Sequence, residues 1–142
     1  MKKSDKIFVD SDVIVSSLIS QQGAAHLLIN KSNLNLYISN FSYKELKIVC
    51  RRLKLNGYHL ERLIKNNFIF IKLKQTIKKI KSKYGKYTTD KNDSHIVAGA
   101  VKAKARFIIS YNIKHFKTNL IKKDFNIILL TPGHFLQYLR SQ

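Results

Sequence analysis

The sequence predicts an α/β fold in three layers, with helices covering both faces of a mostly parallel sheet of roughly five strands. Short apolar runs alternate along the chain with longer segments whose apolar residues recur at helical spacing. These runs are continuously apolar, which is typical of parallel strands that are buried on both faces. The chain has 142 residues, enough for one core, so we expect a single domain over residues 1–142.

The first third of the chain predicts a strand followed by two helices. Ile7-Phe8-Val9 is a short apolar run that ends at an acidic residue, as expected of a buried strand. The apolar residues from Val13 to Ile19 suit a buried helix, with Ser11 or Asp12 as its cap. A second helix is expected from Ala24 to Ile29.

The next segment predicts a second strand and a third helix. Leucine and isoleucine alternate with polar residues over positions 34–38, the pattern of a half-buried strand. Ser42 and Glu45 have the spacing of a capping box, which predicts that the following helix begins there. One face of that helix carries Leu46, Val49, Cys50 and Leu53.

The middle of the chain is rich in lysine. A helix is expected over Tyr58–Asn66 and a third strand at Phe68–Ile71. The densely basic segment from Lys72 to Lys86 fits either a solvated helix or a loop, and the sequence does not decide between them. Asp93 then opens a helix whose apolar residues have the spacing of a packed face.

The last third predicts two more strands and a closing helix. The strands are expected at Phe107–Ile109 and Ile127–Leu130. Pro132 suits the first turn of a helix that continues to Leu139.

The amino-acid composition indicates which kind of partner and which cellular compartment to expect. The formal net charge of +19 favours a polyanion such as RNA, although a lysine-rich codon bias explains the charge equally well. No stretch of about eighteen apolar residues occurs, so we expect no membrane span. Cys50 is the single cysteine, which excludes an intrachain disulfide. Asp10 and Asp12 interrupt any signal-peptide core, so we expect a cytoplasmic protein.

Five of the eight acidic residues fall in three short stretches, as Asp10, Asp12, Glu45, Asp90 and Asp93. Ligands of open parallel sheets bind beyond the carboxyl ends of the strands, where these acids and Asn112 can converge. Clustered carboxylates repel one another unless a cation neutralises them, and oxygen ligands suit Mg²⁺ or Mn²⁺. The alternative is that Asp12, Asp90, Asp93 and Glu45 only cap helices. A capping role is less favoured for Asp10, because it ends a buried strand.

The order and spacing of these motifs resemble those of PIN-domain ribonucleases, above all the toxin-like branch of prokaryotic toxin–antitoxin pairs. The segments that carry the resemblance span nearly the whole chain: Val9–Ser16, Glu45-Leu46, Asp90–Ile96, Phe107–Asn112 and Leu130–Leu136. The resemblance implies an endoribonuclease that depends on Mg²⁺ or Mn²⁺. It also implies an antitoxin that inserts a peptide over the acidic pocket, and it allows a homodimer.

The resemblance assigns roles to individual residues. Asp10, Glu45 and Asp93 are the implied metal ligands, and with Asn112 they form the implied catalytic set. The implied supporting residues are Ser11, Asp12, Asp90, Ser110 and His115. The family often has aspartate at the position of Asn112 and asparagine at that of Asp12. Asparagine brings no charge, so we expect one well-held metal and a second that is weak or arrives with substrate.

Two assignments leave alternatives open. His115 follows the fourth strand, and it either contacts a scissile phosphate or packs in that turn. The predicted RNA-binding track comprises Lys72, Lys74, Lys78, Lys79, Lys81 and Lys83. Tyr84 and Tyr87 would stack on bases beside this track. A solvated basic helix explains the same lysines.

Two other functions compete with the nuclease. Asp10-Ser11-Asp12 also resembles the nucleophile loop of haloacid-dehalogenase-type phosphatases, but only Asp124 offers an acid late in the chain. An RNA-binding regulatory module with a weak or inactive site is favoured by Asn112 and the high charge. The sequence contains no glycine-rich phosphate loop, which argues against nucleotide-driven chemistry.

Overall fold

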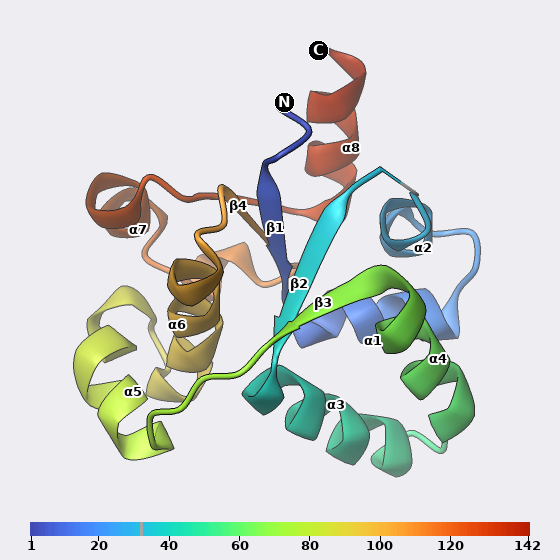
Figure 1. The fold of residues 1–142 in the computed structure, drawn as a ribbon, viewed down its shortest axis with the longest axis horizontal. Coiled ribbons are helices and arrows are strands. Elements are labelled where there is room, and N and C mark those ends of the chain that lie inside the picture. Colours follow the sequence, from blue (N-terminus) through green and yellow to red (C-terminus); the bar gives the residue numbers. More distant parts are fainter. Residues whose placement is uncertain (32) are drawn as a thin grey trace.

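A computed structural model describes residues 1–31 and 33–142, and its central feature is a five-stranded sheet (Figure 1). Neighbouring strands are parallel, and their order across the sheet is β3-β2-β1-β4-β5. The strands are β1 (Lys6–Val9), β2 (Asn35–Ser39), β3 (Phe68–Ile71), β4 (Phe107–Ile109) and β5 (Ile128–Leu130). The predicted α/β class, the strand positions and the parallel sheet are confirmed.

Helices occupy most of the chain between the strands. They are α1 (Ser11–Ile19), α2 (Ala24–Ile29), α3 (Asn40–Arg52), α4 (Gly57–Asn67), α5 (Ile77–Tyr84), α6 (Ser94–Ala103), α7 (Thr118–Phe125) and α8 (Pro132–Arg140). Short 3₁₀ turns are η1 (Gly85–Tyr87), η2 (Lys91–Asp93) and η3 (Ile113–His115). Within the described ranges, no helix combines the length and the apolar character needed to cross a membrane.

The two faces of the sheet bury two separate apolar cores. Successive side chains of a strand point to opposite faces, so Ile7 and Val9 pack against α1, α2, α3, α4 and α8. Phe8 points the other way and packs with α5, α6 and α7. Figure 1 shows α5, α6 and α7 on one side of the sheet and α1 to α4 on the other. The predicted three layers therefore follow from the apolar central strands β1 and β4, which are covered on both faces.

Helix α6 packs very closely on the central strand. A Cβ atom placed on Gly99 would lie 2.5 Å from Cζ of Phe8, which is too short for any real contact. Only glycine therefore allows α6 this close to β1. Phe8 itself is fully buried.

Two details of the structure differ from the sequence prediction, and a third decides between a helix and a loop for the basic segment. Helix α3 begins at Asn40, and the hydroxyl of Ser39 accepts its capping bond from the backbone amide of Ser42 at 3.1 Å. The predicted capping box from Ser42 to Glu45 is therefore wrong, because Glu45 lies inside the helix. The basic segment forms a helix over its second half, α5. Helix α7 was not predicted, because Ile121 is its one buried residue and the apolar pattern is weak.

Candidate active site

The strand order places a crevice beside Asp10. Strand β1 has β2 on one side and β4 on the other, so the chain reverses its direction across the sheet at β1. Ligand sites of such sheets lie beyond the carboxyl ends of the strands at this switch point. Asp10 follows β1, and its backbone amide donates to the carbonyl of Ile109 at 2.9 Å. Ser110 follows β4 and donates its hydroxyl to Oδ2 of Asp10 at 2.8 Å.

A pocket of about 310 Å³ opens at this point. Its polar lining comes from separate segments of the chain: Asp10, Ser11, Asp12, Glu45, Asp93, Asn112 and His115. Val15, Val49 and Phe116 complete the wall. The four residues predicted to be catalytic thus share one pocket. Asp90 is exposed and lies outside the lining, and its carboxylate accepts from the backbone amide of Asn92 at 2.9 Å, as the capping alternative predicted.

The carboxyl group of Asp10 is the most strongly perturbed group of the pocket. Burial and the neighbouring charge of Asp12 raise its pKa from 3.8 to about 8. The hydrogen bond from Ser110 opposes this rise, and the charges of Glu45 and Asp93 add to it. The pocket therefore disfavours four simultaneous negative charges unless a positive charge enters it.

Glu45 is held by two neighbours. Ser11 donates its hydroxyl to Oε1 of Glu45. His95, on α6, places Nε2 at 3.4 Å from Oε2. The hydrogen bond from His95 is the largest cause that holds the pKa of Glu45 below its usual value, and burial opposes it. Glu45 therefore keeps its negative charge.

His95 lies beside the site, although it is not among the residues that the sequence predicted to belong to it. Its side chain is only 6% exposed, and its Nδ1 is buried with no hydrogen-bond partner among the described residues. A histidine directly before the apolar run Ile96–Ala98, two residues after Asp93, is the one local signal that sets it apart. Its partner, Glu45, lies fifty residues away in sequence, so spacing could not reveal the pair.

Asp12 and Asn112 form a second pair. Oδ2 of Asp12 accepts from the side-chain amide of Asn112 at 3.1 Å and from the backbone amide of Tyr111 at 3.0 Å. The hydroxyl of Ser110 lies 3.4 Å from the same oxygen. Oδ1 of Asp12 is buried without a partner in the described part of the chain. Burial raises the pKa of Asp12. A carboxylate thus lies beside the amide of Asn112.

Asp93 and His115 meet at the rim of the pocket. Oδ2 of Asp93 lies 3.8 Å from Nδ1 of His115, and the histidine side chain is 45% exposed. Burial and the charge of Asp90 raise the pKa of Asp93, while His115 and His95 oppose the rise. Asp93 precedes α6 without a side-chain capping bond among the described residues, so the capping alternative fails for it.

The sequence also matches a known family. A sequence model of the PIN-domain family matches residues 6–114. This match covers most of the chain and includes every acidic residue of the pocket. The chain belongs to the PIN-domain family. Proteins of this family are nucleases, and they generally use divalent metal ions. No sequence among curated proteins matched the chain.

Solved structures with the same fold include components of toxin–antitoxin complexes. VapBC2 from Rickettsia felis, bound to a DNA fragment from their promoter, has a TM-score of 0.61 and 14% identity over 89% of this chain and 98% of that chain. A toxin–antitoxin complex from Klebsiella pneumoniae has a TM-score of 0.62 and 18% identity over 89% and 97%. VapBC-1 from nontypeable Haemophilus influenzae has a TM-score of 0.59 and 15% identity over 90% and 98%. At these identities the similarity shows the fold.

The pocket of this PIN domain has the donors that a hard divalent cation prefers. Its carboxylates and amide offer oxygen ligands, Oδ1 of Asp12 is unpartnered, and Asp10 carries a raised pKa that a cation would lower. In their present rotamers, no three acidic, histidine or cysteine side chains of residues 1–31 and 33–142 gather as a ready-made metal cluster. Glu45 instead turns to Ser11 and His95, and Asp93 to His115.

The predicted RNA track lies on α5 and the segment before it. Lys72, Lys74, Lys78, Lys79 and Lys83 are exposed, and Lys81 is half-buried. The predicted stacking role of Tyr84 and Tyr87 is wrong, because both rings are buried against Phe125. The hydroxyl of Tyr87 donates to Asp124 at 2.7 Å, which is the main reason that its pKa rises to about 12.

Proposed function

We propose that this PIN-domain protein is an endoribonuclease that hydrolyses RNA phosphodiester bonds with the help of Mg²⁺ or Mn²⁺. One observation carries the proposal: Asp10, Glu45 and Asp93, from three separate segments, line one pocket at the switch point of the sheet. A bound divalent cation orients a water molecule and stabilises negative charge on the phosphodiester. Asp10, Glu45 and Asp93 would hold it.

The remaining polar residues position these ligands. Ser110 holds the carboxyl of Asp10, while Ser11 and His95 hold that of Glu45. The pair of Asp12 and Asn112 keeps a carboxylate beside the amide. His115 stands at the rim, where its ring can donate to a phosphate of the substrate.

We propose further that the enzyme is the toxin of a toxin–antitoxin pair and acts in the cytoplasm. Support comes from three solved structures of the same fold, two of them VapBC proteins and one a toxin–antitoxin complex. An antitoxin would cover the acidic pocket with a peptide and so block access of RNA. A net charge of +19 favours the approach of RNA and becomes less effective as salt is added. A homodimer is part of the same proposal.

Cleavage of RNA by the purified chain tests the nuclease directly. With Mn²⁺ present we expect cleavage of single-stranded RNA, and we expect Asp10→Asn and Asp93→Asn each to abolish it while the chain stays folded. Asp124→Asn makes the same chemical change on α7, outside the pocket, and should leave cleavage intact. Cleavage that persists in either pocket variant would remove that residue from the catalytic set.

An RNA-binding module with a weak or inactive site is the second candidate, and Asn112 favours it because an amide adds no charge to the pocket. Titration with Mn²⁺ separates the two. A metal-binding nuclease gains thermal stability as Mn²⁺ is added, because the cation binds the folded chain. A melting temperature that does not change with Mn²⁺ would favour the binding module.

A further inference from the structure

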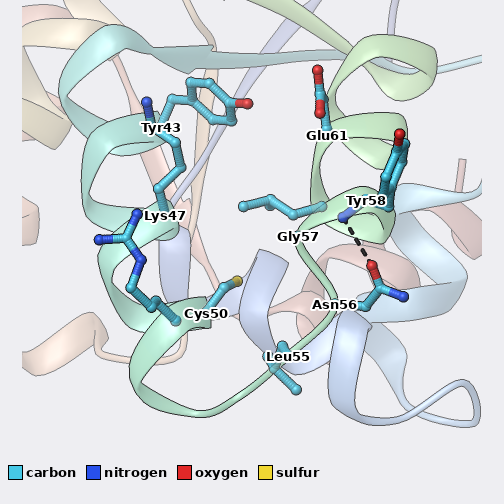
Figure 2. Close-up of a pocket in the computed structure, with 10 residues that line it drawn as sticks. Tyr43, Lys47, Cys50, Leu55, Asn56, Gly57, Tyr58 and Glu61 are labelled. Atoms are coloured by element: carbon cyan, nitrogen blue, oxygen red, sulfur yellow. Dashed lines mark hydrogen bonds between the residues drawn. The ribbon is translucent and has the colours of Figure 1, made fainter.

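A second pocket of about 520 Å³ lies between α3 and α4 (Figure 2). In Figure 2, Tyr43 and Lys47 of α3 stand on one side of it, and Tyr58 and Glu61 of α4 stand on the other. Lys47 is two residues from Glu45 and two from Val49, about 200° around the helix from each. Helix α3 therefore presents Glu45 and Val49 to the candidate active site and Lys47 to this second pocket.

The second pocket combines an exposed ring, Tyr58, and a half-buried ring, Tyr43, with cations. Tyr58 is 77% exposed, and its backbone is held at the start of α4 by the capping side chain of Asn56, which accepts from the Tyr58 amide at 2.9 Å. Nζ of Lys47 lies 4.8 Å from the centre of the Tyr43 ring, and Arg51 adds a second cation. Rings beside lysine and arginine are the elements with which proteins bind single-stranded nucleic acids.

We propose that the α3–α4 pocket binds one nucleotide of a single-stranded RNA substrate, with its base against Tyr58 and its phosphate against Lys47 and Arg51. The proposal rests on the proposed ribonuclease function. It places a stacking residue where the structure has an exposed tyrosine, in contrast to the buried Tyr84 and Tyr87.

The charges of the two walls orient the nucleotide. Lys47 and Arg51 belong to α3, whereas Glu61 belongs to α4. A carboxylate repels a phosphate, but it accepts a hydrogen bond from the exocyclic amino group of a base, as in contacts of Glu or Asp with cytosine N4. The base therefore lies toward α4, and a base with an amino group is favoured. An acidic peptide would instead meet repulsion from Glu61, which makes it the less suitable occupant.

Binding of short labelled RNA to the full chain tests this assignment. Fluorescence anisotropy with oligocytidylate and oligouridylate, in EDTA so that no cleavage occurs, reports affinity alone. We expect Tyr58→Ala to weaken binding about five- to hundredfold and Tyr58→Phe to retain it, because the ring supplies the stacking. We expect tighter binding of oligocytidylate than of oligouridylate, and Glu61→Gln should reduce that preference.

A matched pair of lysine variants controls for general charge. Lys47→Ala should reduce the slope of log affinity against log salt by about 0.7, because one phosphate contact is lost. Lys123→Ala removes the same charge from an exposed position on α7 and should leave the slope unchanged. Circular dichroism of each variant checks that the fold is retained.

Three results would overturn the assignment. These are wild-type affinity in Tyr58→Ala, tighter RNA binding in Glu61→Gln, and no RNA binding by the wild-type chain in EDTA. Tighter binding in Glu61→Gln would mean that the acid only repels anions. If the wild type cleaves RNA with Mn²⁺ and Tyr58→Ala binds RNA as tightly as the wild type, the nucleotide-binding role of this pocket is refuted, but the nuclease function is not. A chain that binds RNA through Tyr58 but never cleaves it refutes the nuclease alone.

Discussion

Asp10→Asn is expected to stabilise the metal-free protein at neutral pH while it removes activity. Asp10 lies in the pocket with three other acidic side chains, and its pKa is raised from 3.8 to about 8, first by burial and then by the charge of Asp12. A raised pKa means that the folded chain binds this proton more tightly than the unfolded chain does. The stabilising contribution of this proton is therefore complete below about pH 3.8 and is lost as pH rises from about 3.8 to about 8.

The size of this effect follows from the shift in pKa. One pKa unit corresponds to about 1.4 kcal/mol. Asp10 ionises in the unfolded chain but stays mostly protonated in the folded one at pH 7, which lowers the stability of the wild type by on the order of 4 kcal/mol. Total stabilities of small domains are about 5–15 kcal/mol, so this is a large share. For a chain of this length it corresponds to a change in melting temperature on the order of 10 °C. Asparagine cannot ionise, so the variant escapes the loss.

Thermal unfolding between pH 5 and pH 8 in EDTA checks this prediction. In EDTA we expect the wild-type melting temperature to fall relative to that of Asp10→Asn as pH rises. In a separate measurement without EDTA, we expect Mn²⁺ to raise the melting temperature of the wild type but not that of the variant. Asp124→Asn, at an exposed position, should follow the wild-type profile. Parallel pH profiles for the wild type and Asp10→Asn would show that the fold does not raise the pKa of Asp10, and the electrostatic basis of the site would be refuted.

Further substitutions test individual contacts. Asn112→Asp should raise Mn²⁺ affinity in calorimetry because it adds a carboxylate, and an unchanged or lower affinity would place Asn112 away from the metal. The double exchange Asp12→Asn with Asn112→Asp swaps carboxylate and amide across their 3.1 Å contact and should bind Mn²⁺ within a few-fold of wild type, whereas Asp12→Asn alone should bind it more weakly. His95→Ala should weaken Mn²⁺ binding about 10- to 100-fold through loss of its ligand contact, with partial recovery in His95→Gln; equal affinity in all three would make His95 a packing residue. Gly99→Ala should lower the free energy of unfolding by about 1–3 kcal/mol in urea, because its Cβ would collide with Phe8, and wild-type stability would contradict that close approach.

The sheet could be predicted from local pattern because its central strands, β1 and β4, are buried on both faces. Runs such as Phe107–Ile109 are apolar without interruption, as is typical of buried parallel strands. Helix α7 lacked such a pattern, since it packs mainly through Ile121 and exposes its lysines. The start of α3 was misplaced because Ser39 and Ser42 are both acceptable caps, and only the end of β2 determines that Ser39 is used.

The acidic residues of the site could be predicted for a related reason. A parallel strand ends at a fixed edge of the sheet, so an acid that directly follows a strand, such as Asp10, must lie in the crevice there. The sequence order of Asp10, Glu45 and Asp93 also carried the resemblance to PIN domains, which the family match confirms. Their catalytic role stays a prediction that cleavage assays will test.

By itself the sequence determined the α/β class and the positions of the strands, because these depend on residues close together in the chain. The resemblance to PIN domains pointed to the acidic residues that line the pocket. Only the tertiary structure decided which partners meet those acids. His95 reaches Glu45 across fifty residues, and Asn112 reaches Asp12 across one hundred. It also decided that Tyr58 is exposed while Tyr84 and Tyr87 are buried. Contacts between distant residues depend on how helices pack on the sheet, and local pattern carries no record of that packing.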